Sequence, residues 1–305
     1  MYAAIDVGSN TVRMLLGNVR NGKVIPFAYS REITRLKGGQ TEAGLAPESM
    51  QRTLTALQRF HTEILAHEIK ALVVVGTEAL RTATNAKQFI DKVHHQAGMS
   101  LTIFSGEQEA RCSARGALSV VDPIPESSII VDIGGGSTEI VITRGTDVLF
   151  SQSYPLGVVR LAEMKGRGAT DFIGEILTEI GIMFTERGLL DTACLPTTDF
   201  IGTAGTVTTL AAIDLGMVEY DWRRVNNHRL SALAIDGIYD RLVPMTVAER
   251  ERLPGMEAGR GDLIIPGLQV LKGLLELFSK NELIVSDFGL LEGLLLQMAA
   301  EAAIH

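Results

Sequence analysis

The sequence predicts a soluble α/β protein built from two similar halves. The first observation is a hairpin pattern that occurs twice without a gap, at residues 5–16 and again at residues 131–142. The second is an alternation of helical and strand patterns around both copies, which is typical of α/β folds. The third is the length of 305 residues, which exceeds the roughly 100 to 200 residues of a usual single-core domain, so we expect two lobes.

Each copy of the hairpin pattern reads as a strand, a tight turn and a second strand. The first copy is IDVGSNTVRMLL and the second is VDIGGGSTEIVI. Glycines in the turns permit positive φ and let the backbone approach a ligand closely, whereas the flanking aliphatic residues suit buried strands. A single Asp-x-Gly turn is a weak signal because such turns are common in hairpins, but two matching copies favour a shared function.

The remaining helices and strands follow from apolar periodicity and from prolines. Pro47 begins an apolar-periodic run through Ile64, which predicts a helix with proline in its first turn. Pro123 and Pro125 interrupt regular structure before the second hairpin, so we place one lobe at 1–124 and another at 125–305. Further strands are predicted at 71–75, 101–104, 200–202 and 283–286. Helices are predicted at 85–97, at 106–120 and from about residue 290. The last of these helices could pack back on the first lobe over about 292–305.

Composition argues against several classes of protein. The net charge of −8 disfavours a general nucleic-acid binder, which needs a basic face. Two distant cysteines provide neither a disulfide framework nor a thiolate metal site. The apolar stretches near 263–278 and 289–304 are interrupted by charges, so neither provides the ~20 apolar residues of a membrane span. With no signal-peptide pattern at its start, the chain is expected to be cytoplasmic, without nucleic-acid or membrane partners.

Both glycine turns are predicted to bind phosphate. Backbone amides of such a turn form a concave anion site, and two facing turns could hold successive phosphates. Arg13 stands in the first copy where the second has Glu139, and arginine grips phosphate directly whereas glutamate needs a metal ion or water between. The alternative is that these two residues pair with each other or lie solvated at strand edges. The predicted phosphate-binding residues are Asp6, Gly8, Ser9, Asn10, Thr11 and Arg13 in the first turn and Gly134, Gly135, Gly136, Ser137 and Thr138 in the second.

Three other segments place polar residues at strand ends. Glu109 lies in the first turn of a helix that a capping box at 105–108 begins, where it either interacts with the helix dipole or orients and deprotonates water. Arg81 follows a buried strand and reaches either a phosphate or a nearby acid. Gly205 and Thr206 lie where a strand runs into a helix, which suits either anion binding or a tight packing turn.

The remaining basic and histidine residues give weaker signals. The adjacent His94 and His95 are expected on a solvated helix face, since no histidine pair has metal-ligand spacing. Several basic residues in the second half could form a path for a long polyanion, although a solvated surface explains any one of them. These residues are Arg160, Lys165, Arg167, Arg223, Arg224 and Arg229.

Six segments in this order resemble the exopolyphosphatase and guanosine pentaphosphate phosphohydrolase family, and the resemblance spans essentially the whole chain. The segments are 6–13, 77–81, 105–111, 132–139, 156–161 and 202–206. This family belongs to the actin superfamily, so the resemblance implies a two-lobed actin-like (ribonuclease H-like) fold with duplicated domains around a cleft. It further implies Mg²⁺-dependent release of terminal phosphate from inorganic polyphosphate or guanosine pentaphosphate, by a homodimer.

The resemblance also implies roles for individual residues. Glu109 corresponds to the family glutamate before Ala-Arg, which handles the attacking water. Asp132 and Glu139 correspond to the carboxylates on the metal side, where they bind Mg²⁺ and take part in catalysis. The chain departs from the family pattern at Leu291, where arginine is usual, and at 259–262, which reads GRGD in place of ERAD. Contacts to distal parts of the substrate are therefore expected to differ.

Two other functions remain open at this stage. A small kinase of the same superfamily would use ATP as phosphoryl donor. A non-catalytic sensor would bind polyphosphate or an alarmone without releasing phosphate.

Overall fold

The chain folds into two compact units, each with its own sheet and hydrophobic core. The structure is a computed structural model that describes residues 1–164 and 168–303. Unit 1 comprises Met1–Ser119 and Gly289–His305, and unit 2 comprises Val120–Phe288. The chain therefore passes from one unit to the other after Ser119 and returns after Phe288, so the last helix belongs to unit 1.

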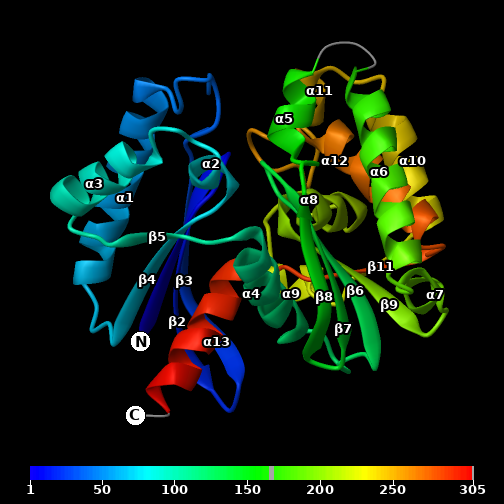
Figure 1. The fold of residues 1–305 in the computed structure, drawn as a ribbon, viewed down its shortest axis with the longest axis horizontal. Helices are drawn as coiled ribbons and strands as arrows, with labels where there is room; N and C mark the ends of the chain where they lie inside the picture. The colour runs from blue at the N-terminus through cyan, green and yellow to red at the C-terminus, as the bar shows by residue number, and fades with distance from the viewer. Residues whose placement is uncertain (165–167, 304–305) are drawn as a thin grey trace. The chain divides into compact units, whose positions relative to one another are not determined.

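Unit 1 contains a five-stranded mixed sheet in the order β3-β2-β1-β4-β5 (Figure 1). Strands β1 to β3 form an antiparallel meander, while β4 and β5 continue the sheet parallel to β1. The first glycine turn connects β1 to β2. The strands are β1 (Tyr2–Val7), β2 (Thr11–Arg20), β3 (Lys23–Ile33), β4 (Ala71–Gly76) and β5 (Leu101–Ile103).

Helices cover both faces of this sheet (Figure 1). Helices α1 and α3 contribute Leu57 and Phe89 to one core, together with Val12 and Met14 of β2. On the other face α13 packs against β1, β2 and α4. As predicted, Pro47 stands in the first turn of α1. The helices are α1 (Pro47–Leu65), α2 (Glu78–Arg81), α3 (Ala86–Ala97), α4 (Gly106–Leu118) and α13 (Leu290–Ala302).

Helices α4 and α13 approach each other closely because glycines face each other across the contact. A Cβ atom at Gly116 would lie 1.8 Å from the carbonyl oxygen of Gly289. A Cβ atom at Gly293 would lie 1.9 Å from the carbonyl oxygen of Cys112. Side chains at these two glycines would therefore force the helices apart.

Unit 2 repeats the topology of unit 1. Its six-stranded sheet has the order β10-β11-β9-β6-β7-β8, so that β8-β7-β6-β9-β11 matches β3-β2-β1-β4-β5 and β10 is an added antiparallel edge strand. The antiparallel pair β6 and β7 carries the second glycine turn. The predicted duplication is thus confirmed in topology. The strands are β6 (Ser127–Ile133), β7 (Thr138–Arg144), β8 (Asp147–Tyr154), β9 (Thr198–Thr203), β10 (Arg229–Ser231) and β11 (Glu282–Val285).

Helices of unit 2 pack on its sheet through a core rich in phenylalanine (Figure 1). Phe184 of α6 lies between Phe150 of β8 and Phe278, with ring centroids 5.2 and 5.0 Å away. The first pair is T-shaped and the second is tilted, and such ring pairs contribute stability beyond the area they bury. The helices are α5 (Val158–Glu163), α6 (Gly168–Glu186), α7 (Leu190–Cys194), α8 (Ala204–Asp214), α9 (Trp222–Val225), α10 (Ala232–Leu242), α11 (Val247–Arg250) and α12 (Ile264–Leu277).

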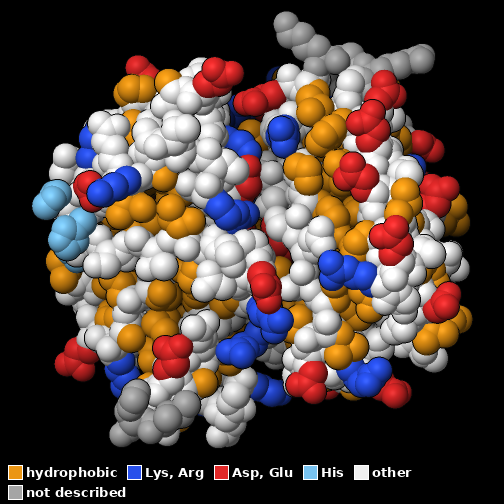
Figure 2. Space-filling view, viewed as in Figure 1, with side chains coloured by type: hydrophobic (Ala, Val, Ile, Leu, Met, Phe, Trp, Pro, Cys, Tyr) orange, Lys and Arg blue, Asp and Glu red, His pale blue; other side chains and the backbone are white. Residues whose placement is uncertain are grey.

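The surface mixes acidic, basic and apolar side chains. Figure 2 shows red and blue side chains interspersed over the face in view rather than gathered into one basic field. His94 and His95 are exposed on α3, as predicted. Over the part of the chain that the structure describes, every helix is too short or too polar to span a membrane.

Candidate functional site

The first glycine turn is closed by a backbone hydrogen bond and flanked by an ion pair. The Gly8 amide donates to the Thr11 carbonyl at 3.0 Å. Asp6 and Arg13 are direct cross-strand partners, and Arg13 Nη2 and Nε donate to Asp6 Oδ2 at 2.5 and 3.0 Å. The other oxygen, Oδ1, is buried without a hydrogen-bond partner among the described residues. Asp6 therefore orients Arg13 at the turn.

A segment after β3, residues 34–38, wraps around this first turn. The amides of Thr34 and Arg35 donate to the Asn10 carbonyl, and the Lys37 amide donates to the Ser9 carbonyl at 3.1 Å. These bonds hold the backbone of Ser9 and Asn10 in place. The sequence predicts that both residues contact phosphate.

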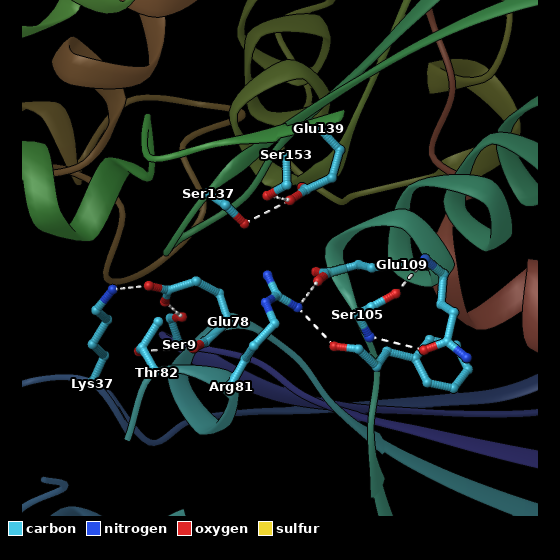
Figure 3. Close-up of polar contacts among 12 residues, drawn as sticks. Ser9, Lys37, Glu78, Arg81, Thr82, Ser105, Glu109, Ser137, Glu139 and Ser153 are labelled. Carbon is cyan, nitrogen blue, oxygen red and sulfur yellow. Dashed lines mark hydrogen bonds and ion pairs between the residues drawn. The ribbon is translucent and has the colours of Figure 1, made fainter. Parts of the chain in front are cut away.

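Lys37 and Glu78 form an ion pair beside the turn, and Ser9 Oγ donates to Glu78 Oε2 at 3.0 Å (Figure 3). Neither Lys37 nor Glu78 was identified from the sequence, because they are 41 positions apart and only the fold brings them together. Ser9 thus uses its hydroxyl proton within unit 1, and Lys37 adds a cation next to the turn.

Arg81 holds the carboxylate that was predicted to handle water. Its Nη1 donates to Glu109 Oε2 at 3.0 Å and to the Phe104 carbonyl at 2.8 Å (Figure 3). Arg81 was expected to reach either a phosphate or a nearby acid, and in the structure it pairs with the acid Glu109. The predicted capping box is confirmed, with Ser105 and Gln108 exchanging hydrogen bonds at the start of α4.

The two carboxylates in the first turn of α4 differ in their surroundings. The Glu109 side chain is 12% exposed and bound to Arg81, whereas the Glu107 side chain is 63% exposed and paired with Arg111 one turn along the helix. A carboxylate with a fixed orientation can align a water molecule, while an exposed one samples many rotamers. Glu109 is therefore the better placed of the two for catalysis.

The second glycine turn has the same backbone closure as the first. The Gly134 amide donates to the Ser137 carbonyl at 3.0 Å. Helix α5 packs directly on the turn, since the Val158 and Val159 amides donate to the Gly134 and Gly135 carbonyls. The approach requires Gly157, where a Cβ atom would lie 2.0 Å from the carbonyl carbon of Gly136. The 156–161 segment thus supports the turn through its backbone.

Glu139 is the most enclosed carboxylate of this turn. It is 2% exposed and is the direct cross-strand partner of Asp132, so both carboxylates lie on the same face of the sheet. Ser137 Oγ and Ser153 Oγ donate to Glu139 Oε1 at 2.7 and 2.6 Å (Figure 3). The Thr138 hydroxyl donates to the Leu156 carbonyl, so its side chain supports the fold beside the site. Ser153 was not identified from the sequence, because only the pairing of β7 with β8 brings it to Glu139.

The third predicted anion site lies at the start of α8. Ala204 has a φ of 67°, which turns the chain sharply from β9 into the helix. A Cβ atom at Gly205 would lie 1.7 Å from Arg260 Nη2, so the guanidinium of Arg260 rests on the bare backbone of Gly205. Arg260 also pairs with Glu257, and Thr206 is buried against Gly267. The residues 203–206 and Arg260, called the Gly205 turn below, combine helix-terminal amides with a cation.

Asp132 and Glu139 form a donor set that suits Mg²⁺. Among residues 1–164 and 168–303 there is no cluster of three or more Asp, Glu, His or Cys side chains that could hold a metal ion. Mg²⁺ commonly binds through one or two carboxylates together with water and substrate phosphates, so a pair of adjacent carboxylates meets its requirements. The two serine hydroxyls on Glu139 fix the orientation of this carboxylate.

The basic residues expected to form a polyanion path have mostly local partners. Arg160 lies over the Phe172 ring, and Arg229 pairs with Glu282. Arg223 pairs with Asp221, and Arg224 is exposed. Lys165 and Arg167 lie outside the described residues. At the departure from the family pattern, Leu291 is buried in unit 1 beside Glu292, which caps the start of α13.

Comparisons with known proteins agree along the full length of the chain. The model of the Ppx/GppA phosphatase family matches residues 17–302. "Exopolyphosphatase 2" of Mycobacterium tuberculosis is 30% identical over 313 residues, covering 97% of this chain and 98% of that protein. A bifunctional 3-dehydroquinate synthase/phosphatase of Fusobacterium nucleatum is 29% identical, and the match covers 97% of this chain but 46% of that protein.

Solved structures of the same family have the same fold. The Aquifex aeolicus Ppx/GppA family member superposes with a TM-score of 0.80 at 29% identity, covering 99% of this chain and 98% of that one. An exopolyphosphatase from Cytophaga hutchinsonii superposes with a TM-score of 0.87 at 26% identity, covering 98% of each chain. The predicted α/β fold with two duplicated halves is confirmed, and it is the fold of the Ppx/GppA family. With a family match over nearly its whole length and the duplicated glycine turns in place, the chain belongs to the Ppx/GppA phosphatase family.

Proposed function

We propose that this protein is an exopolyphosphatase, which releases terminal phosphate from inorganic polyphosphate by attack of water on the last phosphoryl group. The observation that carries the proposal is the fixed Glu109 carboxylate in the first turn of α4, held by Arg81 at 3.0 Å. A carboxylate locked in one orientation can align water and accept its proton in the transition state. The family match and the exopolyphosphatases among its relatives support the same reaction class.

The glycine turns would bind the phosphates through their backbone amides. Arg13 is oriented by Asp6, and its positive charge would stabilise a phosphoryl oxygen at this turn. In unit 2 the Gly205 turn adds helix-terminal amides and the Arg260 guanidinium. Phosphoryl transfer depends mainly on positioning and on stabilising the charge of the transferred group, and these residues are suited to both.

Asp132 and Glu139 would hold Mg²⁺ together with oxygens of the substrate. When bound, the ion supplies positive charge that lowers the cost of placing a polyanion beside carboxylates. Ser137 and Ser153 keep Glu139 in a single orientation by donating to one of its oxygens. Guanosine pentaphosphate, which ends in the same phosphoanhydride, is the second substrate that we propose.

Phosphate release from three substrates tests the proposal. Wild-type protein with Mg²⁺ is expected to release phosphate from long-chain polyphosphate and from guanosine pentaphosphate, and much less from ATP. Glu109→Gln should lower kcat by about 10² to 10⁴-fold, the usual contribution of a general base, with a smaller effect on KM. Glu107→Gln is the matched control, because Glu107 lies in the same helical turn but is exposed and paired with Arg111. Release from ATP alone would favour a kinase-like enzyme, and binding without release would favour a sensor.

A further inference from the structure

Lys37 is connected to the first glycine turn through both its backbone and its side chain. Its amide donates to the Ser9 carbonyl at 3.1 Å. Its ammonium group forms an ion pair with one carboxylate oxygen of Glu78, and the other oxygen accepts the Ser9 hydroxyl at 3.0 Å (Figure 3). Lys37, Glu78 and Ser9 therefore form a closed set of contacts around one residue of the turn.

The backbone on either side of Lys37 is held by unit 1. Leu36 is fully buried in the core of this unit. The Gly38 carbonyl accepts a hydrogen bond from the Ser49 hydroxyl of α1 at 3.1 Å. The Lys37 side chain is 17% exposed, so its ion pair with Glu78 is largely enclosed, unlike the solvated surface pairs that contribute little.

The position of Glu78 is set by the sheet of unit 1. Glu78 is the first residue of α2, which follows β4, and β4 lies parallel to β1. The Thr77 amide donates to the Val7 carbonyl at 3.3 Å, which brings the start of α2 next to the strand that ends at the turn. The Glu78 side chain is 12% exposed. A carboxylate fixed at this place holds the Ser9 hydroxyl in one orientation.

A carboxylate beside an anion-binding turn would by itself oppose the binding of an anion. Like charges repel strongly at a partly buried site, because the effective dielectric constant there is about 20 rather than the ~80 of water. Asp6 and Glu78 are both at this turn, and each is paired with a cation, Arg13 and Lys37 respectively. Each pair is formally neutral, so neither carboxylate leaves a net negative charge beside the amides of the turn.

We propose that Lys37 allows the first glycine turn to accept a polyanion, because it neutralises the Glu78 carboxylate that orders Ser9. This role rests on the proposed phosphatase function, in which the turn binds phosphate, and it assigns to that site a residue which acts on the substrate through Glu78. Lys37 is therefore a positioning residue. Glu78 keeps the turn ordered, and Lys37 removes the electrostatic cost of placing a carboxylate there.

Lys37→Met tests this role, because methionine keeps an unbranched side chain but carries no charge. We would measure the Kd of the full-length protein for pyrophosphate, in buffer with Mg²⁺, by isothermal titration calorimetry. Lys37→Met should raise the Kd by about 10- to 100-fold, the ratio expected for one uncompensated charge beside a polyanion at a partly buried site. Lys23→Met, at an exposed lysine that begins β3, is the matched control and should leave the Kd unchanged. An unchanged Kd in Lys37→Met would overturn the proposal.

Removing the charge of Glu78 distinguishes neutralisation from direct binding of phosphate by Lys37. Glutamine at this position still accepts a hydrogen bond from Ser9 but has no charge. Lys37→Met combined with Glu78→Gln should therefore return the Kd to within about 3-fold of the wild type, and the double-mutant cycle measures this coupling. If the double variant binds as weakly as Lys37→Met alone, Lys37 contacts the phosphate or supports the fold, and the proposed role is wrong.

Ionic strength and a charge-conserving variant provide two further readouts. Salt screens the repulsion from an uncompensated carboxylate, since the Debye length falls from ~10 Å at 0.1 M to ~3 Å at 1 M. The ratio of the Kd of Lys37→Met to that of the wild type should therefore shrink as KCl is raised over this range. Lys37→Arg keeps the charge and should bind more tightly than Lys37→Met. A ratio that does not change with salt would show lost packing and would contradict the role of Lys37.

Phosphate release from polyphosphate by the wild-type protein separates this role from the proposed function. If polyphosphate is hydrolysed but Glu78→Gln does not rescue Lys37→Met, the role of Lys37 alone is wrong. If the rescue is observed but phosphate is not released from any substrate, the role of Lys37 stands and the proposed hydrolysis is wrong.

Discussion

Arg81 Nη1 bridges the Glu109 carboxylate, at 3.0 Å, and the Phe104 carbonyl, at 2.8 Å. The two acceptors flank the N-cap of α4, so one guanidinium nitrogen ties the end of a strand to the first turn of the next helix. Arginine suits this place because its rigid, planar group holds donors in fixed directions. Within unit 1, Arg81 therefore acts on Glu109, whether or not it also reaches a phosphate.

Arg81→Lys is expected to lower kcat by about 10- to 100-fold while changing KM less. Lysine presents a compact charge on a flexible stem and cannot reproduce the geometry of the bridge, so Glu109 would lose its fixed orientation. Steady-state kinetics with tripolyphosphate measures both constants. If KM instead rises with kcat unchanged, Arg81 binds the substrate directly and does not position Glu109.

Ser153→Ala is expected to weaken the response to Mg²⁺. Without the Ser153 hydroxyl, the Glu139 carboxylate would be held less firmly. This should raise the Mg²⁺ concentration for half-maximal activity by about 10- to 100-fold, the usual cost of removing a group that orients a metal-binding side chain. Binding of Mn²⁺, followed by electron paramagnetic resonance, gives a readout independent of turnover. Ser151→Ala is the control, because Ser151 lies on the same strand but is not the cross-strand partner of Glu139. An equal rise in the required Mg²⁺ concentration in Ser151→Ala would show that Ser153 has no special role.

Local features of the fold could be predicted from the sequence because they depend on neighbours along the chain. The helix beginning at Pro47 and the capping box at Ser105 each follow from residues within a few positions of one another. The two hairpins follow from glycine turns flanked by aliphatic residues. The end of α4 at Leu118 is slightly earlier than predicted, because helix ends depend on packing as well as on periodicity.

The contacts that orient site residues could not be predicted in the same way. Ser153 reaches Glu139 only because β8 pairs with β7, and the register of that pairing is set by the whole sheet. Lys37 reaches Glu78 through a segment that wraps the first turn, and Arg260 reaches Gly205 from another part of unit 2. Each of these contacts joins residues that are far apart in the sequence, so the spacing of residues along the chain does not predict the contact.

The Cys112 thiol is expected to resist alkylation in the folded protein. Burial raises its pKa from an ordinary 9.0 to about 12, so almost no thiolate exists at pH 8, and the sulfur lies against the Leu290 carbonyl at 3.7 Å. Iodoacetamide with mass spectrometry should label Cys112 only after denaturation, and Cys194, which is less buried, before it. Rapid labelling of Cys112 at pH 8 would contradict this.

The same shift in pKa makes stability depend on pH. Between pH 9 and about pH 12 the unfolded chain loses the thiol proton while the folded chain keeps it, so stability falls as pH rises through this range. Below pH 9 both states keep the proton and the contribution is constant. Denaturant unfolding of the wild type and of Cys112→Ala should therefore show a steeper loss above pH 9 in the wild type. Parallel curves would contradict the assignment.

Alanine at Gly116 or Gly293 is expected to destabilise unit 1, because the new methyl group would collide with backbone of the facing helix. The ideal Cβ positions lie 1.8 and 1.9 Å from carbonyl oxygens, and backbone cannot rotate away as a side chain can. We expect the free energy of unfolding to fall by about 1–3 kcal/mol for each substitution, the usual cost of overpacking. Gly237→Ala in α10 is the matched control: no atom lies within 4 Å of its Cβ position, so higher helix propensity should stabilise the protein by about 0.5–1 kcal/mol. Urea denaturation followed by circular dichroism measures all three variants, and a loss of stability at Gly237 equal to that at Gly116 would show that the close approach of α4 and α13 is not what requires glycine.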